Sequence, residues 1–142
     1  MTRLLDSALW FFLVPMGVSL VGTIVVEETV ALFMGFRRGR DLIAVAAVNL
    51  VTNPFVVWAA YLSVFLLFRA VGALGNAALL WLLVPVVVAL ELCAVLAEWL
   101  LLRWALKTGS RATLKLSFVM NATSFAAGLV AGAVWALLAF PR

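Results

Sequence analysis

Four long apolar runs occupy most of the 142-residue chain. They cover residues 8–36, 42–68, 77–102 and 116–140, with two charged residues at most in each. A helix needs about 20 mainly apolar residues to cross the hydrocarbon core of a bilayer, so every run is long enough. The pattern predicts an all-α integral membrane protein, a four-helix bundle in which residues 1–142 form a single membrane domain.

Basic residues gather in two of the segments between these runs. Segments 37–41 and 103–115 hold seven of the ten lysines and arginines, and the others are Arg3, Arg69 and Arg142. Both segments lie on the same side of a four-span protein, and short loops rich in Lys and Arg stay in the cytoplasm. We therefore expect four spans in a bacterial cytoplasmic membrane, with both termini extracytoplasmic.

The two halves of the chain resemble each other at an offset of 70 residues. When the segment ending at Glu28 is set over the segment ending at Glu98, eight of twenty positions are identical. The rarer matches, Pro15 with Pro85 and Glu28 with Glu98, carry most weight in so apolar a text. A parallel repeat of this kind implies a pseudo-two-fold axis along the membrane normal. The predicted tandem repeats are the transmembrane hairpins 8–68 and 77–140.

Polar residues inside the runs share one depth in the cytoplasmic half. At 1.5 Å per residue, Glu28, Asn49 and Asn121 lie roughly 9–13 Å from the cytoplasmic ends of their helices. We expect these residues to form one ligand-binding or ion-binding site. The candidates are Glu28, Glu91, Glu98, Asn49, Asn53 and Asn121, with Glu27, Thr52 and Ser124 as secondary candidates.

Either of two adjacent glutamates in the first run could face the interior of the bundle. Glu27 continues a polar stripe with Ser19 and Thr23, whereas the repeat selects Glu28, about 100° away around the helix. We favour Glu28 as the residue that faces the bundle.

A carboxylate inside a membrane must be neutral, paired or hydrated, because it costs at least about 2.5–3.5 kcal/mol there. The spans contain no basic partner, so desolvation and mutual repulsion favour the protonated forms. Carboxyl and amide oxygens suit proton exchange or the binding of a hard cation. The structural alternative is that Glu28 and Glu98 extend to the interface and pair with basic residues there.

Composition excludes several other classes of site. The chain is 68% hydrophobic and 11% charged, whereas soluble domains carry about a quarter charged residues. It has no histidine and one cysteine, Cys93, which excludes bis-histidine haem, His-ligated zinc and thiolate clusters. Lys107 and Lys115 lie in a polar segment, so the spans offer no Schiff-base lysine. We expect no cofactor and no nucleic-acid partner, and the sequence leaves open whether a metal binds.

The leading hypothesis is a small transport protein or channel subunit that handles protons, a hard cation or a cationic solute. Because four spans enclose little space, a homodimer or a partner membrane protein is expected to complete the pathway. The small residues Gly128 and Gly132, with Ala127 and Ala131 alongside, make the fourth run a candidate contact.

Two other classes remain open. In the first, the chain is a non-catalytic accessory subunit of a larger complex, and its polar layer only sets helix register. In the second, a lipid-acting enzyme uses Glu91 and Glu98 as an acid–base pair. The lack of histidine and of a long loop makes an enzyme the less favoured choice.

Overall fold

The structure, a computed structural model, describes residues 2–71 and 76–139. Arg142 and the last residue of the second predicted repeat lie outside the described residues. The chain forms four helices, all long and apolar enough to cross a membrane, which confirms the all-α, four-span prediction. They are α1 (Thr2–Phe33), α2 (Gly39–Val71), α3 (Asn76–Leu106) and α4 (Ser110–Ala139).

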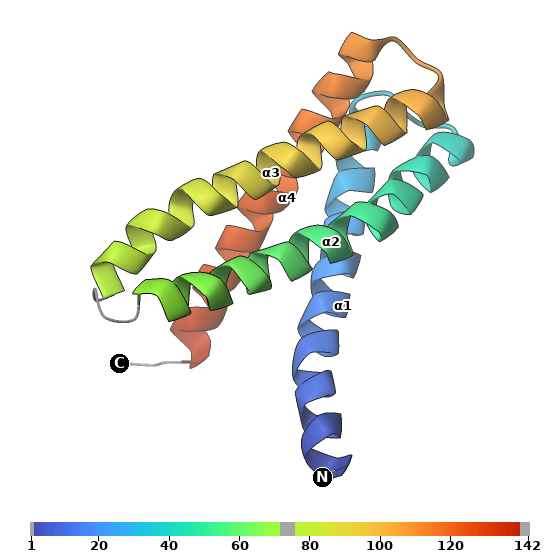
Figure 1. The fold of residues 1–142 in the computed structure, drawn as a ribbon. Coiled ribbons are helices and arrows are strands. Elements are labelled where there is room, and N and C mark those ends of the chain that lie inside the picture. The colour runs from blue at the N-terminus through green and yellow to red at the C-terminus, as the bar shows by residue number, and fades with distance from the viewer. Residues whose placement is uncertain (1, 72–75, 140–142) are drawn as a thin grey trace.

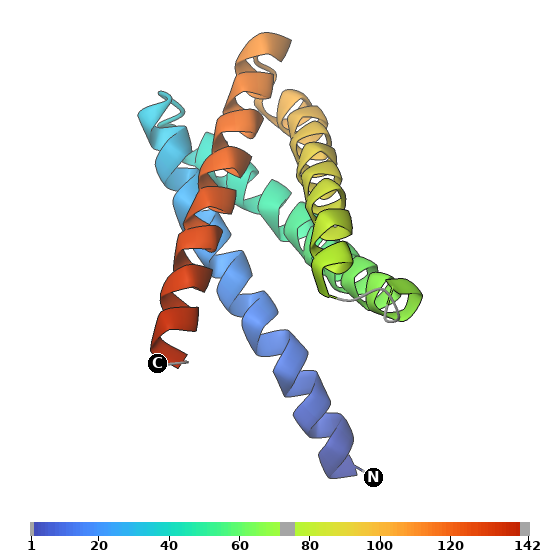
Figure 2. The ribbon, with the colours of Figure 1, turned by 90° about the vertical axis from the view of Figure 1, so that its left-hand side faces the viewer.

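The helices form a ring in which α1 and α3 each pack against both α2 and α4. They converge at the end that holds the α1–α2 and α3–α4 turns, which we call the loop side (Figure 1). Toward the opposite end, which we call the terminal side, α1 and α4 diverge from each other and from α2 and α3, which stay side by side (Figure 2). Close packing is therefore concentrated near the two turns.

The turn after α1 is built around Gly35. Its φ of 92° is a left-handed conformation that glycine adopts without a steric penalty. The Phe36 amide then donates to Ala31 O at 3.0 Å, and the Gly35 amide donates to Leu32 O at 3.2 Å. This pair of bonds is the Schellman motif, which satisfies helix-terminal carbonyls and reverses the chain toward α2.

The turn between α3 and α4 is shorter than the predicted polar segment 103–115. Helix α3 continues to Leu106 and α4 begins at Ser110, so most of that segment is helical. Lys and Arg side chains have long apolar stems, so their charges can reach the interface while the backbone stays helical. The Trp99 indole N–H also donates to Ser110 O at 3.1 Å and ties the two helices together.

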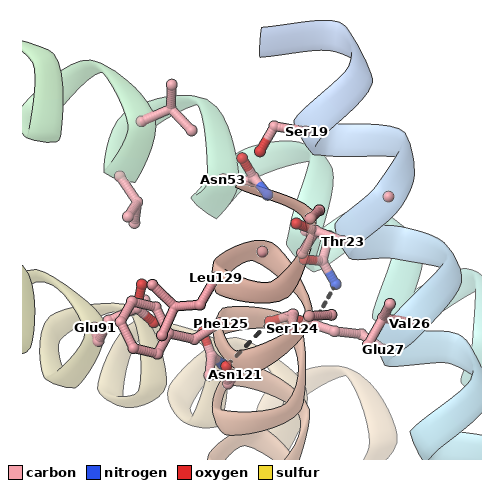
Figure 3. A pocket seen from close by; sticks show the side chains of 18 of the residues that line it. Ser19, Thr23, Val26, Glu27, Asn53, Glu91, Asn121, Ser124, Phe125 and Leu129 are labelled. Atoms are coloured by element: carbon pink, nitrogen blue, oxygen red, sulfur yellow. Dashed lines mark hydrogen bonds between the residues drawn. The ribbon is translucent and has the colours of Figure 1, made fainter. Parts of the chain in front are cut away.

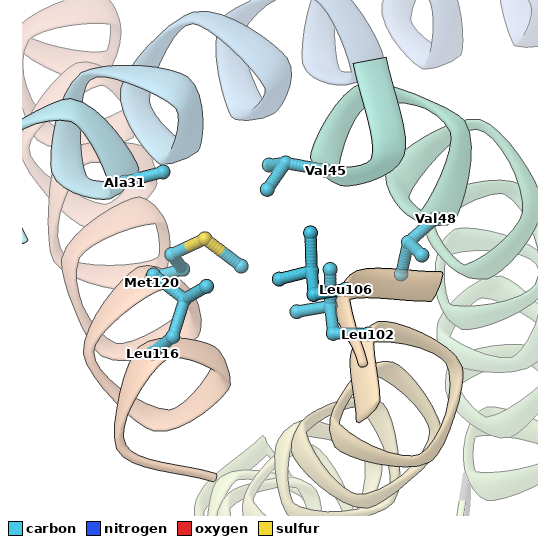
Figure 4. Close-up of a cluster of buried hydrophobic side chains, with 7 residues drawn as sticks. All are labelled: Ala31, Val45, Val48, Leu102, Leu106, Leu116 and Met120. Carbon is cyan, nitrogen blue, oxygen red and sulfur yellow. The ribbon is translucent and has the colours of Figure 1, made fainter. Parts of the chain in front are cut away.

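A cluster of buried apolar side chains fills the bundle on the loop side (Figure 4). All four helices contribute to it, and Leu102 and Leu116 are fully buried. This loop-side core consists of Ala31, Val45, Val48, Leu102, Leu106, Leu116 and Met120.

Truncating the loop-side core should destabilise the protein more than truncating a lipid-facing position on the same helix. Leu102 is 0% exposed, whereas Leu100 is 56% exposed. We expect Leu102→Ala to lower the free energy of unfolding by about 2–4 kcal/mol, because it leaves a cavity. Leu100→Ala should cost less than half as much. Unfolding by sodium dodecyl sulfate in mixed micelles measures both, and equal losses would contradict this description of the core.

Candidate functional site

A cavity of about 660 Å³ lies between the four helices, on the terminal side of the loop-side core. Its lining falls within residues 18–27 of α1, 49–57 of α2, 91–98 of α3 and 121–131 of α4. On each helix the core residues follow on the loop side of these segments. The cavity therefore has a floor, formed where its polar residues meet the core.

Glu27 of α1 is fully buried at this floor. Its Oε2 accepts a hydrogen bond from Asn49 Nδ2 of α2 at 2.7 Å. Its Oε1 accepts one from Ser124 Oγ of α4 at 3.0 Å (Figure 3 shows Glu27 and Ser124 at the cavity). Two neighbouring helices thus supply the donors for one carboxyl group.

Glu98 of α3 is 3% exposed and is held in a similar way. Its Oε2 accepts a close hydrogen bond from Asn121 Nδ2 of α4 and a longer one from Ser117 Oγ at 3.5 Å. Its Oε1 accepts one from Thr52 Oγ1 of α2 at 3.1 Å.

The same pattern of donors therefore occurs twice. Each carboxyl group accepts an amide hydrogen bond from the asparagine 22 or 23 residues later, on the next helix. Glu27 also accepts a hydroxyl hydrogen bond from Ser124, three residues after Asn121. Glu98 likewise accepts one from Thr52, three residues after Asn49. Both asparagines donate in addition to the carbonyl four residues earlier on their own helix, Val45 O and Ser117 O.

The hydroxyl groups can serve either protonation state of the carboxyl groups. Thr52 Oγ1 also lies 3.0 Å from Val48 O, and Ser124 Oγ lies 3.1 Å from Asn121 O. A hydroxyl carries one hydrogen and two acceptor lone pairs. It can donate to an ionised carboxylate, or donate to the backbone carbonyl and accept the proton of a neutral carboxyl group. Proton exchange then requires hydroxyl rotation, and no helix has to move.

Most of the predicted site residues meet at this floor. Glu98, Asn49, Asn121, Thr52 and Ser124 all belong to the hydrogen-bonded cluster.

The prediction that Glu28, and not Glu27, faces the interior of the bundle was wrong. Glu27 is buried and bonded at the floor, whereas Glu28 is half-buried and lies outside the cavity lining. Adjacent residues on a helix point about 100° apart, so only one of the two can face the interior. The polar stripe of Ser19 and Thr23, which also line the cavity, is the sequence signal that indicated Glu27.

Two predicted residues line the cavity above the floor. Asn53 lies one helical turn beyond Asn49, and Glu91 lies two turns beyond Glu98, both toward the terminal side (Figure 3). The Oδ1 atoms of Asn49 and Asn53 are buried and accept no hydrogen bond within the described residues. The cavity lining therefore contains two unsatisfied acceptors, one at the floor and one a helical turn above it.

Ser117 belongs to the cluster although it was not a predicted site residue. It is fully buried, and its single hydroxyl hydrogen can point to Val95 O at 2.8 Å or to Glu98 Oε2 at 3.5 Å. Its position four residues before Asn121, on the same helix face, is the signal that could have identified it.

Ion pairing does not account for the buried carboxyl groups. Among residues 2–71 and 76–139, the single ion pair joins Arg40 Nε and Asp41 Oδ1 at 4.0 Å. Glu98 is held by neutral donors and does not extend to a basic residue at the interface. In the same described part of the chain, no three His, Cys, Asp or Glu side chains are grouped as for a metal ion.

Comparison of the chain with protein-family models, curated proteins and solved structures found no match.

Removing one amide donor should measurably weaken the bundle. Asn121→Ala leaves Glu98 without its closest donor, so we expect a loss of about 1–2 kcal/mol in the free energy of unfolding. The control is Thr123→Ala, because Thr123 is exposed and its hydroxyl donates only to Val119 O of its own helix. This control should cost less than about 0.5 kcal/mol. Equal losses in the two variants, measured by the same micelle unfolding, would show that the amide contributes nothing specific.

Proposed function

We propose that this protein is a small membrane transporter that exchanges protons for a cation at the Glu27–Glu98 pair. One observation carries the proposal. Two buried carboxyl groups lie at the floor of a cavity between the helices, and neutral donors from other helices hold both.

Proton exchange follows from where the pair lies. Ser124 joins Glu27 to the backbone of Asn121, whose side chain bonds Glu98, so the two carboxyl groups lie in one layer and repel each other when both are ionised. Burial in a membrane interior adds a cost for each charge, so a proton or another cation must compensate the pair. The rotating hydroxyls of Thr52 and Ser124 give both protonation states their hydrogen bonds.

Binding of a cation in place of the protons follows from the oxygen ligands. Carboxylates and amide carbonyls bind hard cations and ammonium groups. Asn49 donates to Glu27 through Nδ2 and is 1% exposed, and its buried Oδ1 accepts no hydrogen bond from the described residues. A cation or its N–H group would supply the interaction that this oxygen needs.

The loop-side core supports access from one side at a time. The cavity extends from the floor toward the terminal side, whereas the core fills the bundle toward the turns. Segments 37–41 and 103–115 carry most of the positive charge, so we place the turns on the cytoplasmic side of a bacterial inner membrane. The cavity then faces outward, and release to the cytoplasm requires the core to separate.

We also propose that the two hairpins arose by tandem duplication. Glu98 follows Glu27 by 71 residues, and Asn121 and Ser124 follow Asn49 and Thr52 by 72. Equivalent residues make equivalent hydrogen bonds, as a parallel repeat about a pseudo-two-fold axis would produce. This register replaces the pairing of Glu28 with Glu98.

Neutralising the pair should abolish cation-driven proton movement. The assay uses proteoliposomes that contain a pH-sensitive dye, to which Na⁺, K⁺, Mg²⁺ or an organic ammonium ion is added. With wild-type protein, at least one of these cations should change the internal pH. Glu27→Gln with Glu98→Gln should reduce that change to the level of protein-free vesicles. Glu28→Gln is the matched control and should retain the wild-type rate, because Glu28 lies outside the cavity lining.

Full activity of the double variant would contradict the proposal. If no cation moves protons through the wild-type protein and a second membrane protein co-purifies with it, the accessory-subunit hypothesis takes its place.

A further inference from the structure

The cavity contains a third carboxyl group that the proton-exchanging pair does not use. Glu91 lines the cavity from α3, is half-buried, and makes no ion pair within the described residues. Figure 3 shows it among the residues that line the cavity. A carboxylate in a membrane span must be neutral, hydrated or paired, and a bound cation in the cavity would pair with Glu91.

Glu91 and Glu98 lie seven residues apart on one helix, and both line the cavity. Two helical turns separate them by about 10 Å along the axis. Side chains on a helix lean the same way along the axis, so the carboxyl groups keep this spacing. The cavity therefore offers negative charge at two depths, at the floor and nearer the terminal side.

Small and apolar residues line part of the wall between these two depths, where Thr23 and Asn53 also lie. Ala94 of α3, Gly22 of α1 and Gly128 of α4 line it there. A methyl group added at either glycine would meet no other atom within 4 Å, so the cavity is open beside both positions. Such a wall fits a chain of methylene groups better than a hydrated metal ion.

The floor supplies acceptors for N–H groups. Asn49 lines the cavity, is 1% exposed, and has an Oδ1 that accepts no hydrogen bond from the described residues. Its Nδ2 is committed to Glu27 Oε2 and Val45 O, so the amide cannot be flipped without placing oxygen against oxygen. An ammonium nitrogen with hydrogens can donate to this oxygen and to the carboxyl pair, whereas a quaternary ammonium cannot.

We propose that the cavity binds a linear organic diammonium ion, with one ammonium group at the floor beside Glu27, Glu98 and Asn49 and the other at Glu91. The alkyl chain lies along the small apolar wall between them. This assignment rests on the proposed proton exchange, because the cation takes the place of the protons carried by the floor pair.

Binding to the purified full-length protein tests the assignment by isothermal titration. The probe is 1,8-diaminooctane, which can bridge the two depths. One comparison compound, 8-amino-1-octanol, has the same length and one charge, and the other, 1,3-diaminopropane, has two charges and is too short. Wild-type protein should bind 1,8-diaminooctane about tenfold more tightly than either comparison compound, the effect of one added charge pair. Titration in two buffers of different ionisation enthalpy should show proton release.

Variants then separate the two subsites. Glu91→Gln should remove the tenfold preference and leave the affinity for 8-amino-1-octanol unchanged. Gly128→Val narrows the cavity and should weaken both octane compounds. Gly17→Val is its control, because Gly17 has similar free space and lies outside the cavity lining.

The outcomes distinguish this assignment from the proposed function. If sodium or another panel cation drives proton movement in vesicles but 1,8-diaminooctane binds no better than 8-amino-1-octanol, the diammonium assignment is wrong and proton exchange stands. Equal weakening of both octane compounds by Glu91→Gln also overturns it. If no cation moves protons and neither octane compound binds, both proposals fail.

Discussion

The structure depends on how two carboxyl groups are buried inside a bundle that is otherwise apolar. Each oxygen of Glu27 and Glu98 accepts a hydrogen bond from another helix, and every donor is a neutral amide or hydroxyl. Inside a membrane an unsatisfied polar group costs several kcal/mol, so these bonds constrain helix rotation and register. The polar layer thus fixes which faces of the four helices meet.

The division of the bundle at this layer places the buried carboxyl groups at the floor of the cavity. On the loop side, a core from all four helices closes the bundle, and on the terminal side α1 and α4 diverge around the cavity. The core therefore separates the cavity from the loop-side end of the bundle.

Much of this arrangement could be predicted from the sequence, because it depends on patterns within each helix and not on how the helices pack against one another. The apolar runs predict four helices, and depth along each run predicts that Asn49, Asn121 and Glu98 meet. The choice between Glu27 and Glu28 depends on a rotation of 100°, which a repeat register based mostly on Leu and Val matches does not determine. The Ser19–Thr23–Glu27 stripe carried the better information, since a polar face must turn away from lipid.

The length of the α3–α4 turn could not be predicted from charge either. Arg103, Arg111 and Lys115 suggested an extended polar segment, yet the helices keep their backbone bonds and leave only residues 107–109 between them. A charged residue indicates where the end of its side chain lies. Because Lys and Arg side chains are long, it does not indicate whether the backbone there is helical. The cavity could not be predicted from the sequence, because its size depends on how far the helices diverge on the terminal side.

Infrared difference spectroscopy of the purified protein between acidic and alkaline buffers tests the central claim most directly. The account predicts carboxylic-acid bands from Glu27 and Glu98 that convert to carboxylate bands and disappear in the matching Gln variants. Because one hydrogen-bonded cluster holds both groups, Glu27→Gln should also shift the band of Glu98, whereas Glu28→Gln should shift neither. The account would be contradicted if the bands of Glu27 and Glu98 did not change with pH, or if Glu27→Gln left the band of Glu98 unchanged.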